Sequence, residues 1–142
     1  MNDLERAVDI AVDAYAGQTD KAGETYIRHP LRVMEQMDTE TERVVAVLHD
    51  VVEDSAYTLA DIEEAFDVEV RDAVDAVTKR EGEAYLDEFI PRVAANEIAR
   101  TVKRADIEDN MDLTRLSDVD SEILDKQATY HQALQRLESV SE

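Results

Sequence analysis

The chain has 142 residues, 44% of them hydrophobic, with no cysteine and with 35 acidic residues against 15 basic ones, for a formal net charge of −20. Such a length allows one domain with one hydrophobic core, covering residues 1–142, and the lack of cysteine excludes disulfides and thiolate metal sites. The charge argues against nucleic acid and anionic membranes as partners, because both are bound through clustered Lys and Arg.

The first part of the chain has apolar residues at helical spacing. Within residues 4–15 they recur every three or four positions, with charged residues between them, which predicts an amphipathic helix. A second helix is expected over residues 30–37, with Pro30 at its first position, where the missing N–H of proline costs no hydrogen bond. His29 would then lie on a loop directly before this helix.

Two capping boxes open the next predicted helices. Thr39 and Glu42 have the spacing in which each side chain accepts a hydrogen bond from the other residue's backbone. The apolar pattern that follows continues to the end of "VVED", so one helix is expected over residues 40–54. Thr58 and Asp61 open a further helix in the same way.

The rest of the chain also has helical patterns. Asn96 is expected to cap a helix over residues 97–111, and the last 20 residues have the pattern of a closing helix. No segment shows a convincing strand alternation of apolar and polar residues. The sequence therefore predicts an all-α domain of about six to eight helices.

The helix predicted over residues 40–54 carries a histidine and three carboxylates near its end. At helical spacing His49, Asp50, Glu53 and Asp54 share one flank, while their apolar neighbours face the core. Carboxylates so close together repel one another unless a positive charge lies among them. The cluster is therefore a candidate site for a divalent cation, and the alternative is a solvated acidic helix end.

Two other segments supply further candidate ligands. His29 comes before the predicted second helix, and Asp106 shares a helix face with Lys103 and Asn110. Two imidazole nitrogens and two carboxylate oxygens would leave positions open for water and substrate, which suits Mn²⁺, Fe²⁺ or Zn²⁺ better than Mg²⁺. The proposed metal ligands are His29, His49, Asp50 and Asp106.

Each of these residues also has an ordinary structural explanation. A histidine before a proline is more often a capping or packing group than a ligand. Asp106 competes with Asp109 and Asp112, which have the pattern of surface charges. The combination of the residues carries the prediction, not any one of them.

Four segments occur along the chain in a fixed order: GQTDKAGETYIRHPLRV, VLHDVVEDS, DAVTKREGEAY and VKRADIEDNMDL. Together they resemble the HD-domain hydrolases of the RelA/SpoT type, especially the small stand-alone proteins similar to metazoan SpoT-like hydrolases. The resemblance covers about residues 7–116. It implies an all-helical HD-domain fold with Mn²⁺ bound by the four proposed ligands.

The resemblance also implies an activity. Such hydrolases remove the 3′-diphosphate of guanosine tetra- or pentaphosphate, releasing pyrophosphate and leaving GDP or GTP, through a metal-activated water. Glu53 and Asp54 match an acidic pair that would orient and deprotonate this water. Asn110 would help to hold the nucleotide.

A phosphorylated small molecule must still enter a strongly acidic protein. Lys21 and Lys103 lie within the resembling segments, and we expect them to contribute to a basic mouth that attracts phosphate. Tyr26 is a candidate for stacking on the base. The ordinary alternatives are that the two lysines are solvated surface charges and that Tyr26 is a buried ring of the core. The sequence leaves the oligomeric state open.

Two positions depart from the pattern of the resembling proteins. Asp20 stands where an arginine usually precedes the lysine, and Leu113 stands where a threonine usually lies three residues after the asparagine. Two alternatives therefore stay open. One is an HD phosphohydrolase for another nucleotide, such as a 2′- or 3′-phosphorylated adenosine or NADPH, and the other is a non-catalytic acidic helical protein.

The location of the protein follows from what the sequence lacks. No stretch approaches the roughly 18 apolar residues of a membrane span, and "MNDLERAVDIAVD" lacks the basic and apolar regions of a secretion signal, so we expect a cytoplasmic protein. The acidic excess and the presence of only four lysines suggest adaptation to concentrated salt, which screens the repulsion between carboxylates.

Overall fold

The structure, a computed structural model, describes residues 1–140, and within this range the chain is helical and has no β-strand. A single isolated bridge pairs Thr19 with Thr25. The predicted all-α fold is confirmed, with nine α-helices and one π-helical segment where about six to eight helices were expected. In chain order they are α1 (Asp3–Ala14), α2 (Arg28–Glu35), α3 (Glu40–Leu48), α4 (Val51–Asp54), α5 (Leu59–Ala65), α6 (Val68–Val77), η1 (Tyr85–Phe89), α7 (Ile90–Ala94), α8 (Glu97–Asn110) and α9 (Ser121–Glu138).

The helix starts expected from capping residues are present. In α3 the Glu42 N–H donates to the Thr39 hydroxyl at 3.2 Å, and the Thr39 N–H donates to the Glu42 carboxylate at 3.1 Å. Thr58 and Asp61 make the same pair of bonds at the start of α5, and Asn96 caps α8. These side chains satisfy backbone donors that have no partner within the helix.

Helix α2 begins two residues earlier than expected. It starts at Arg28, so His29 lies in its first turn rather than on a preceding loop, and Pro30 is its third residue. Its first hydrogen bond between residues four apart is donated by Leu31 to the Ile27 carbonyl, at 3.2 Å. Because the residues before that point have no such partner, a proline is tolerated at the third position as well as at the first.

The single helix expected over residues 40–54 is divided into α3 and α4 by His49 and Asp50. The His49 N–H reaches the Ala46 carbonyl three residues back, at 3.5 Å, and its ring Nδ1 lies 2.6 Å from the same oxygen. The imidazole therefore competes with the backbone for this acceptor, which favours a break in the helix. The prediction of one continuous helix was wrong, and the break turns His49 inward.

The region between α6 and α8 folds through a wide turn. The Ala84 carbonyl accepts from the N–H groups of Glu88 at 3.0 Å and Phe89 at 2.9 Å, which forms the π-helical segment η1, and α7 follows directly. The closing helix predicted over the last 20 residues corresponds to α9. Its predicted final part, residues 141–142, lies outside the described residues.

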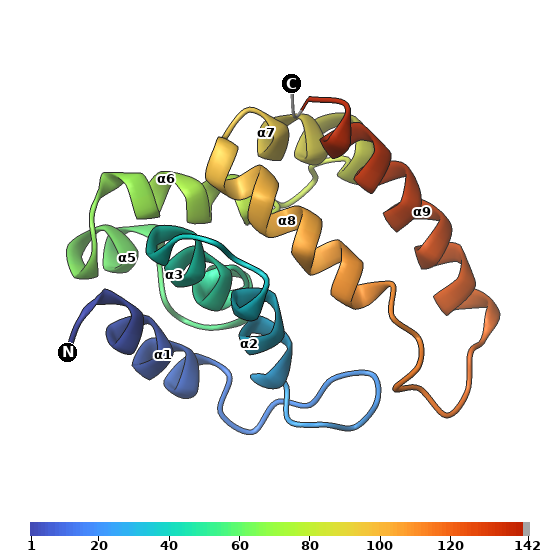
Figure 1. Cartoon of the computed structure of the whole chain (residues 1–142), viewed down its shortest axis with the longest axis horizontal. Helices are drawn as coiled ribbons and strands as arrows, with labels where there is room; N and C mark the ends of the chain where they lie inside the picture. Colours follow the sequence, from blue (N-terminus) through green and yellow to red (C-terminus); the bar gives the residue numbers. More distant parts are fainter. Residues whose placement is uncertain (141–142) are drawn as a thin grey trace.

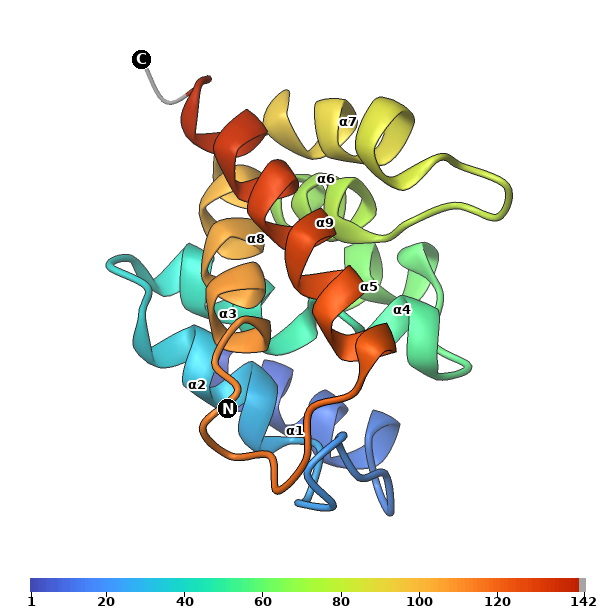
Figure 2. The same ribbon diagram turned by 90° about the vertical axis from the view of Figure 1, so that its right-hand side faces the viewer.

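Two hydrophobic clusters share helix α8, which lies between α3 and α9 (Figure 1). The first surrounds α3, which packs against α1, α2, α6 and α8 and has a fully buried run over residues 44–48. The second joins the end of α6, η1, α7, α8 and α9, and Figure 2 shows α9 lying along α8. Asp106 stands in α8 between Ala105 of the first cluster and Ile107 of the second, so its carboxylate is carried at the junction of the two.

The loops that follow α1 and α8 approach each other at one end of the molecule (Figure 2). Both contribute residues to the same cavity, described below. Among residues 1–140, no helix combines the length and apolar character needed to cross a membrane.

Candidate active site

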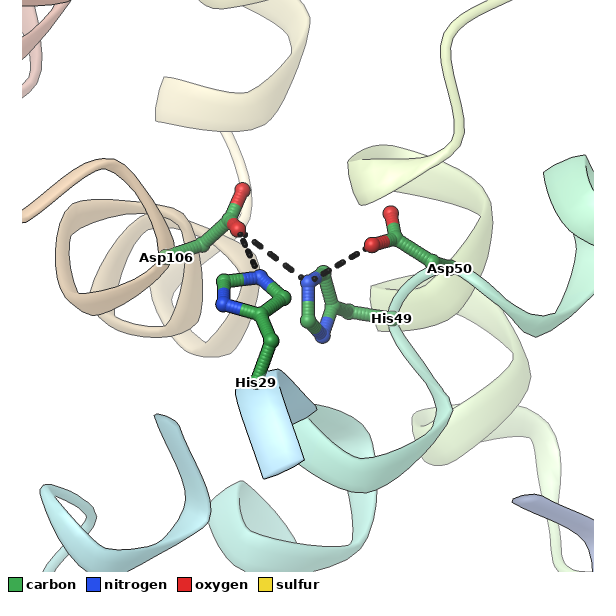
Figure 3. A group of neighbouring side chains, drawn as sticks. All are labelled: His29, His49, Asp50 and Asp106. Atoms are coloured by element: carbon green, nitrogen blue, oxygen red, sulfur yellow. Dashed lines mark hydrogen bonds and ion pairs between the residues drawn. The ribbon is translucent and has the colours of Figure 1, made fainter. Parts of the chain in front are cut away.

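The four predicted metal ligands meet in the interior of the protein (Figure 3). His29 comes from the first turn of α2, His49 and Asp50 from the break between α3 and α4, and Asp106 from the middle of α8. Each offers one ligand atom, and these atoms all lie within 4.8 Å of one another. His29, His49 and Asp106 are buried, and Asp50 is half-buried.

The two imidazoles direct the same ring nitrogen toward the centre of the group. The Nε2 atoms of His29 and His49 lie 2.8 Å and 3.2 Å from the same oxygen, Oδ1 of Asp106. His49 Nε2 also lies 3.1 Å from Oδ2 of Asp50. Two Nε2 atoms and two carboxylates therefore face a common point, which is an arrangement that can bind a first-row divalent cation.

The other ring nitrogen of each histidine is held by an acceptor. His49 Nδ1 lies 2.6 Å from the Ala46 carbonyl, and His29 Nδ1 lies 2.6 Å from Oδ2 of Asp109. An acceptor at Nδ1 keeps the proton there and leaves Nε2 free to bind a metal. The donor set and the support around it thus fit a divalent cation.

Asp106 is held on both of its oxygens. Lys103 Nζ donates to Oδ2 at 2.9 Å, and Asn110 Nδ2 donates to Oδ1 at 3.2 Å. Burial raises the pKa of Asp106, but the Lys103 ammonium and the His49 imidazole outweigh it and lower this pKa well below its usual value. Lys103 itself lies under the rings of Tyr85 and Phe89, so its charge is directed to Asp106.

Asp50 is oriented by two tyrosines from the loop and helix that precede it. The Tyr26 hydroxyl donates to Oδ2 of Asp50, and the Asp50 backbone N–H donates to the Tyr15 hydroxyl at 3.2 Å. Burial and the neighbouring Asp50 charge raise the pKa of Tyr26, so its phenol keeps its proton and remains a donor. Tyr26, predicted to stack on a base, is thus in direct contact with a proposed metal ligand.

Glu53 and Asp54 lie on α4, on the exposed side of the metal-ligand group. The prediction that they share a rim with His49 was wrong, because His49 is 1% exposed and points inward. Glu53 Oε1 accepts from the Lys79 backbone N–H at 2.6 Å. Partial burial and the charges of Asp50 and Glu53 raise the pKa of Asp54 to about 6, which is suitable for accepting a proton near neutral pH.

A cavity of about 280 Å³ opens beside the four ligands. His29 and Asp50 line it together with Lys21, Tyr26 and Asn110, so three of the residues predicted to bind substrate are brought to one place. Glu53, Asp54 and Lys103 are not part of this wall. Its apolar side is formed by Leu113, Leu116 and Ile123.

Two residues of this region were missed from the sequence. Asp109, treated as a surface charge, contacts His29, and Arg32 donates to Asp109 through Nε at 2.9 Å and Nη2 at 3.1 Å. Partial burial raises the pKa of Asp109, but the hydrogen bonds from His29 and Arg32 outweigh it and lower this pKa. The available signal was spacing: Arg32 follows His29 by three positions, and Asp109 follows Asp106 by three.

The helical fold and the His, His-Asp and Asp ligand set are those of an HD domain, and residues 7–119 match the family model described by that name. The chain belongs to the HD-domain family. Membership implies a divalent metal, which the four-residue group could hold, and leaves the identity of the metal open.

Several curated proteins are similar over about half of this chain. The bifunctional (p)ppGpp synthase/hydrolase SpoT of Escherichia coli K12 is 40% identical over 80 residues, which is 54% of this chain and 11% of that protein. The guanosine-3′,5′-bis(diphosphate) 3′-pyrophosphohydrolase of Haemophilus influenzae is 43% identical over 74 residues, 49% of this chain and 11% of that protein. The chain thus spans about a tenth of the length of these relatives.

A solved structure matches almost the whole chain. It is described as a metazoan ortholog of SpoT that hydrolyzes ppGpp and plays a role in starvation responses. The TM-score is 0.81, and the match covers 99% of this chain and 88% of that one at 22% sequence identity. At this identity the likeness establishes the shared HD-domain fold.

Proposed function

We propose that this protein is a Mn²⁺-dependent hydrolase of guanosine tetra- and pentaphosphate that releases pyrophosphate and leaves GDP or GTP. The observation that carries the proposal is a four-residue metal site opening on a cavity that Lys21, Tyr26 and Asn110 also line. The printed activities of the SpoT-like relatives support this choice of substrate. Fe²⁺ and Zn²⁺ are the alternatives to Mn²⁺ for such a donor set.

The chemistry is displacement at phosphorus by water. The water oxygen forms a bond to the phosphorus attached to the ribose 3′ oxygen, and the bond between that phosphorus and the 3′ oxygen breaks. Pyrophosphate carries the new oxygen away, and the 3′ oxygen takes up a proton. When bound, a divalent cation would supply positive charge to the phosphate oxygens and increase the acidity of water at the site.

The side chains of this chain have three tasks in that reaction. Glu53 and Asp54 orient the attacking water and accept its proton, and the raised pKa of Asp54, about 6, suits that role near neutral pH. Lys21 and Asn110 bind the nucleotide from the cavity wall. Lys103 is bonded to Asp106 and lies outside that wall, so it supports the reaction by holding Asp106.

A second candidate substrate is another phosphorylated nucleotide, such as a 2′- or 3′-phosphorylated adenosine or NADPH. The observation that favours it is the pair of unusual residues Asp20 and Leu113, both of which line the cavity. Asp20 Oδ1 accepts from the backbone of Ala22 and Glu24 at 2.9 Å each, which fixes this carboxylate in the loop. A negative group held there changes which edge of a base the cavity accepts.

The experiment is product analysis on a panel of nucleotides with Mn²⁺-loaded protein at high salt. Release of pyrophosphate and GDP from ppGpp, with less than a hundredth of that rate for Glu53→Gln, would support the proposal. Turnover of an adenosine nucleotide in place of ppGpp would favour the second candidate. No turnover of any nucleotide, with loose metal binding, would favour a non-catalytic acidic helical protein.

A further inference from the structure

The carboxylate of Asp109 is fixed on both of its oxygens, although it contributes no atom to the four-residue metal site. Arg32 approaches it side-on, with Nε 2.9 Å from Oδ1 and Nη2 3.1 Å from Oδ2. Arg115 lies beyond, with Nη2 3.6 Å from Oδ2 and 3.1 Å from the Asp109 carbonyl. A two-pronged guanidinium contact of this kind fixes the plane of a carboxylate as well as its position.

The fixed carboxylate faces one partner on the metal side, His29, whose Nδ1 lies 2.6 Å from Oδ2. Asp109 is mostly buried, with 14% of its side chain exposed, and His29 is buried too. A carboxylate oxygen so close to Nδ1 requires the proton on that nitrogen. With that proton held on Nδ1, Nε2, which lies 2.8 Å from Oδ1 of Asp106, is the nitrogen available to a bound metal.

His49 offers an internal comparison. Its Nδ1 is held at the same distance, 2.6 Å, by the backbone carbonyl of Ala46. A backbone carbonyl cannot be removed by substitution and carries no net charge, whereas Asp109 is a charged acceptor supplied by a side chain. The two histidines are therefore oriented by the same principle with acceptors of different strength, and the orientation of His29 depends on one replaceable residue.

We propose that Asp109, held by Arg32, is a positioning residue of the metal site, which fixes the tautomer and ring orientation of His29 and thereby increases metal affinity. The proposal depends on the proposed function only in treating the four residues as metal ligands. It is tested by metal binding without any nucleotide, so it can fail or succeed independently of the hydrolase assignment.

The first test is calorimetric titration of metal-free protein with Mn²⁺. Asp109→Ala is expected to weaken Mn²⁺ binding by about 10- to 100-fold, the usual effect of removing the partner of a metal-binding histidine. Asp109→Asn is expected to recover most of the loss, because its amide oxygen still accepts from Nδ1. Glu108→Gln, which removes one charge from the exposed neighbouring position, is the matched control and should bind as the wild type does.

The second test is a double-substitution cycle with Arg32→Ala. Alone, this change should weaken Mn²⁺ binding less than Asp109→Ala does. In the Asp109→Ala background it should have no further effect, because Arg32 acts through Asp109. If Asp109→Ala does not fold by circular dichroism, Asp109→Asn supplies the background. The loss of Mn²⁺ affinity caused by Arg32→Ala is then expected to be no larger than in wild type, and a larger loss would overturn the proposal.

Mn²⁺ binding by Asp109→Ala within twofold of wild type would overturn the proposal, as would strictly additive effects of the two changes. A wild type that binds Mn²⁺ tightly but does not hydrolyse ppGpp would overturn the proposed function and leave this inference intact. A wild type that hydrolyses ppGpp, with Mn²⁺ affinity independent of Asp109, would do the reverse.

Discussion

Asp54 is expected to reduce the stability of the metal-free protein, because it places a third negative charge beside Asp50 and Glu53. Partial burial and these two charges raise the pKa of Asp54 from 3.8 to about 6. A raised carboxyl pKa means that the folded state resists ionisation, so the ionised side chain lowers the free energy of unfolding at neutral pH. Asp54→Asn removes that charge at nearly constant size.

The size of the effect follows from the pKa shift. A rise in the pKa of Asp54 from 3.8 to about 6 would correspond to about 3 kcal/mol if the side chain were fully buried. Asp54 is exposed, so solvent screening reduces the expected gain for Asp54→Asn to about 1 kcal/mol at pH 7. For a chain of 142 residues this is a rise in melting temperature of about 3–4 °C.

The stability advantage of Asp54→Asn over the wild type depends on pH. Above about pH 6 the wild-type carboxylate is ionised in both states, and the full advantage of Asp54→Asn is present. As pH falls through 6 toward 3.8, the folded carboxyl takes up its proton first and the advantage disappears.

The assay is thermal unfolding of both proteins between pH 4 and 8 in the presence of a chelator. Equal or lower stability of Asp54→Asn at pH 7, or a gain that persists at pH 4, would show that the Asp54 charge does not destabilise the folded state. Ser55→Ala, at the adjacent position, is a poor control because its hydroxyl donates to the Val51 carbonyl. Glu64→Gln, at an exposed position on α5, tests charge removal instead.

Three further results are expected. Arg92→Lys should lower the free energy of unfolding, measured in urea, by about 1–2 kcal/mol, because Arg92 contacts both Glu83 oxygens at 2.9 Å. Hydrogen bonds from Arg92 and Arg80 lower the pKa of Glu83 to about 2. The loss should therefore shrink as pH falls from 4.5 toward 2, where Glu83 becomes protonated. Tyr26→Phe removes the donor to Asp50 and should lower kcat/KM for ppGpp by about tenfold with the fold unchanged by circular dichroism; full activity would contradict the contact. Raising KCl should raise the melting temperature, since it screens repulsion among the 35 acidic residues, and a falling melting temperature would count against salt adaptation.

Much of the fold follows from local signals in the sequence. The capping pairs at Thr39 and Thr58 predict the starts of α3 and α5 correctly, because a cap involves residues only three apart. The break at His49 could not be predicted in this way. A continuous apolar pattern favours one helix, whereas the imidazole binds the Ala46 carbonyl and turns toward groups that are distant in the sequence.

The candidate site also has parts that local sequence signals predict and parts that depend on contacts between distant residues. His29, His49, Asp50 and Asp106 were found from residue type and order, and the structure brings them together. Their supporting contacts were not found, because each joins residues far apart in sequence: 80 positions separate His29 from Asp109. Lys103 also depends on a contact that its position near the motif does not reveal, since its ammonium group donates to Asp106.

The most direct test of a metal-dependent hydrolase is the release of pyrophosphate from ppGpp by wild-type protein and by His49→Ala, each with Mn²⁺ and with a chelator. We expect release by the wild type with Mn²⁺ and none in the other three conditions, because His49 supplies one of the two Nε2 atoms of the proposed site. Hydrolysis that continues in the chelator, or in His49→Ala with Mn²⁺, would contradict a metal-dependent reaction at this group of residues.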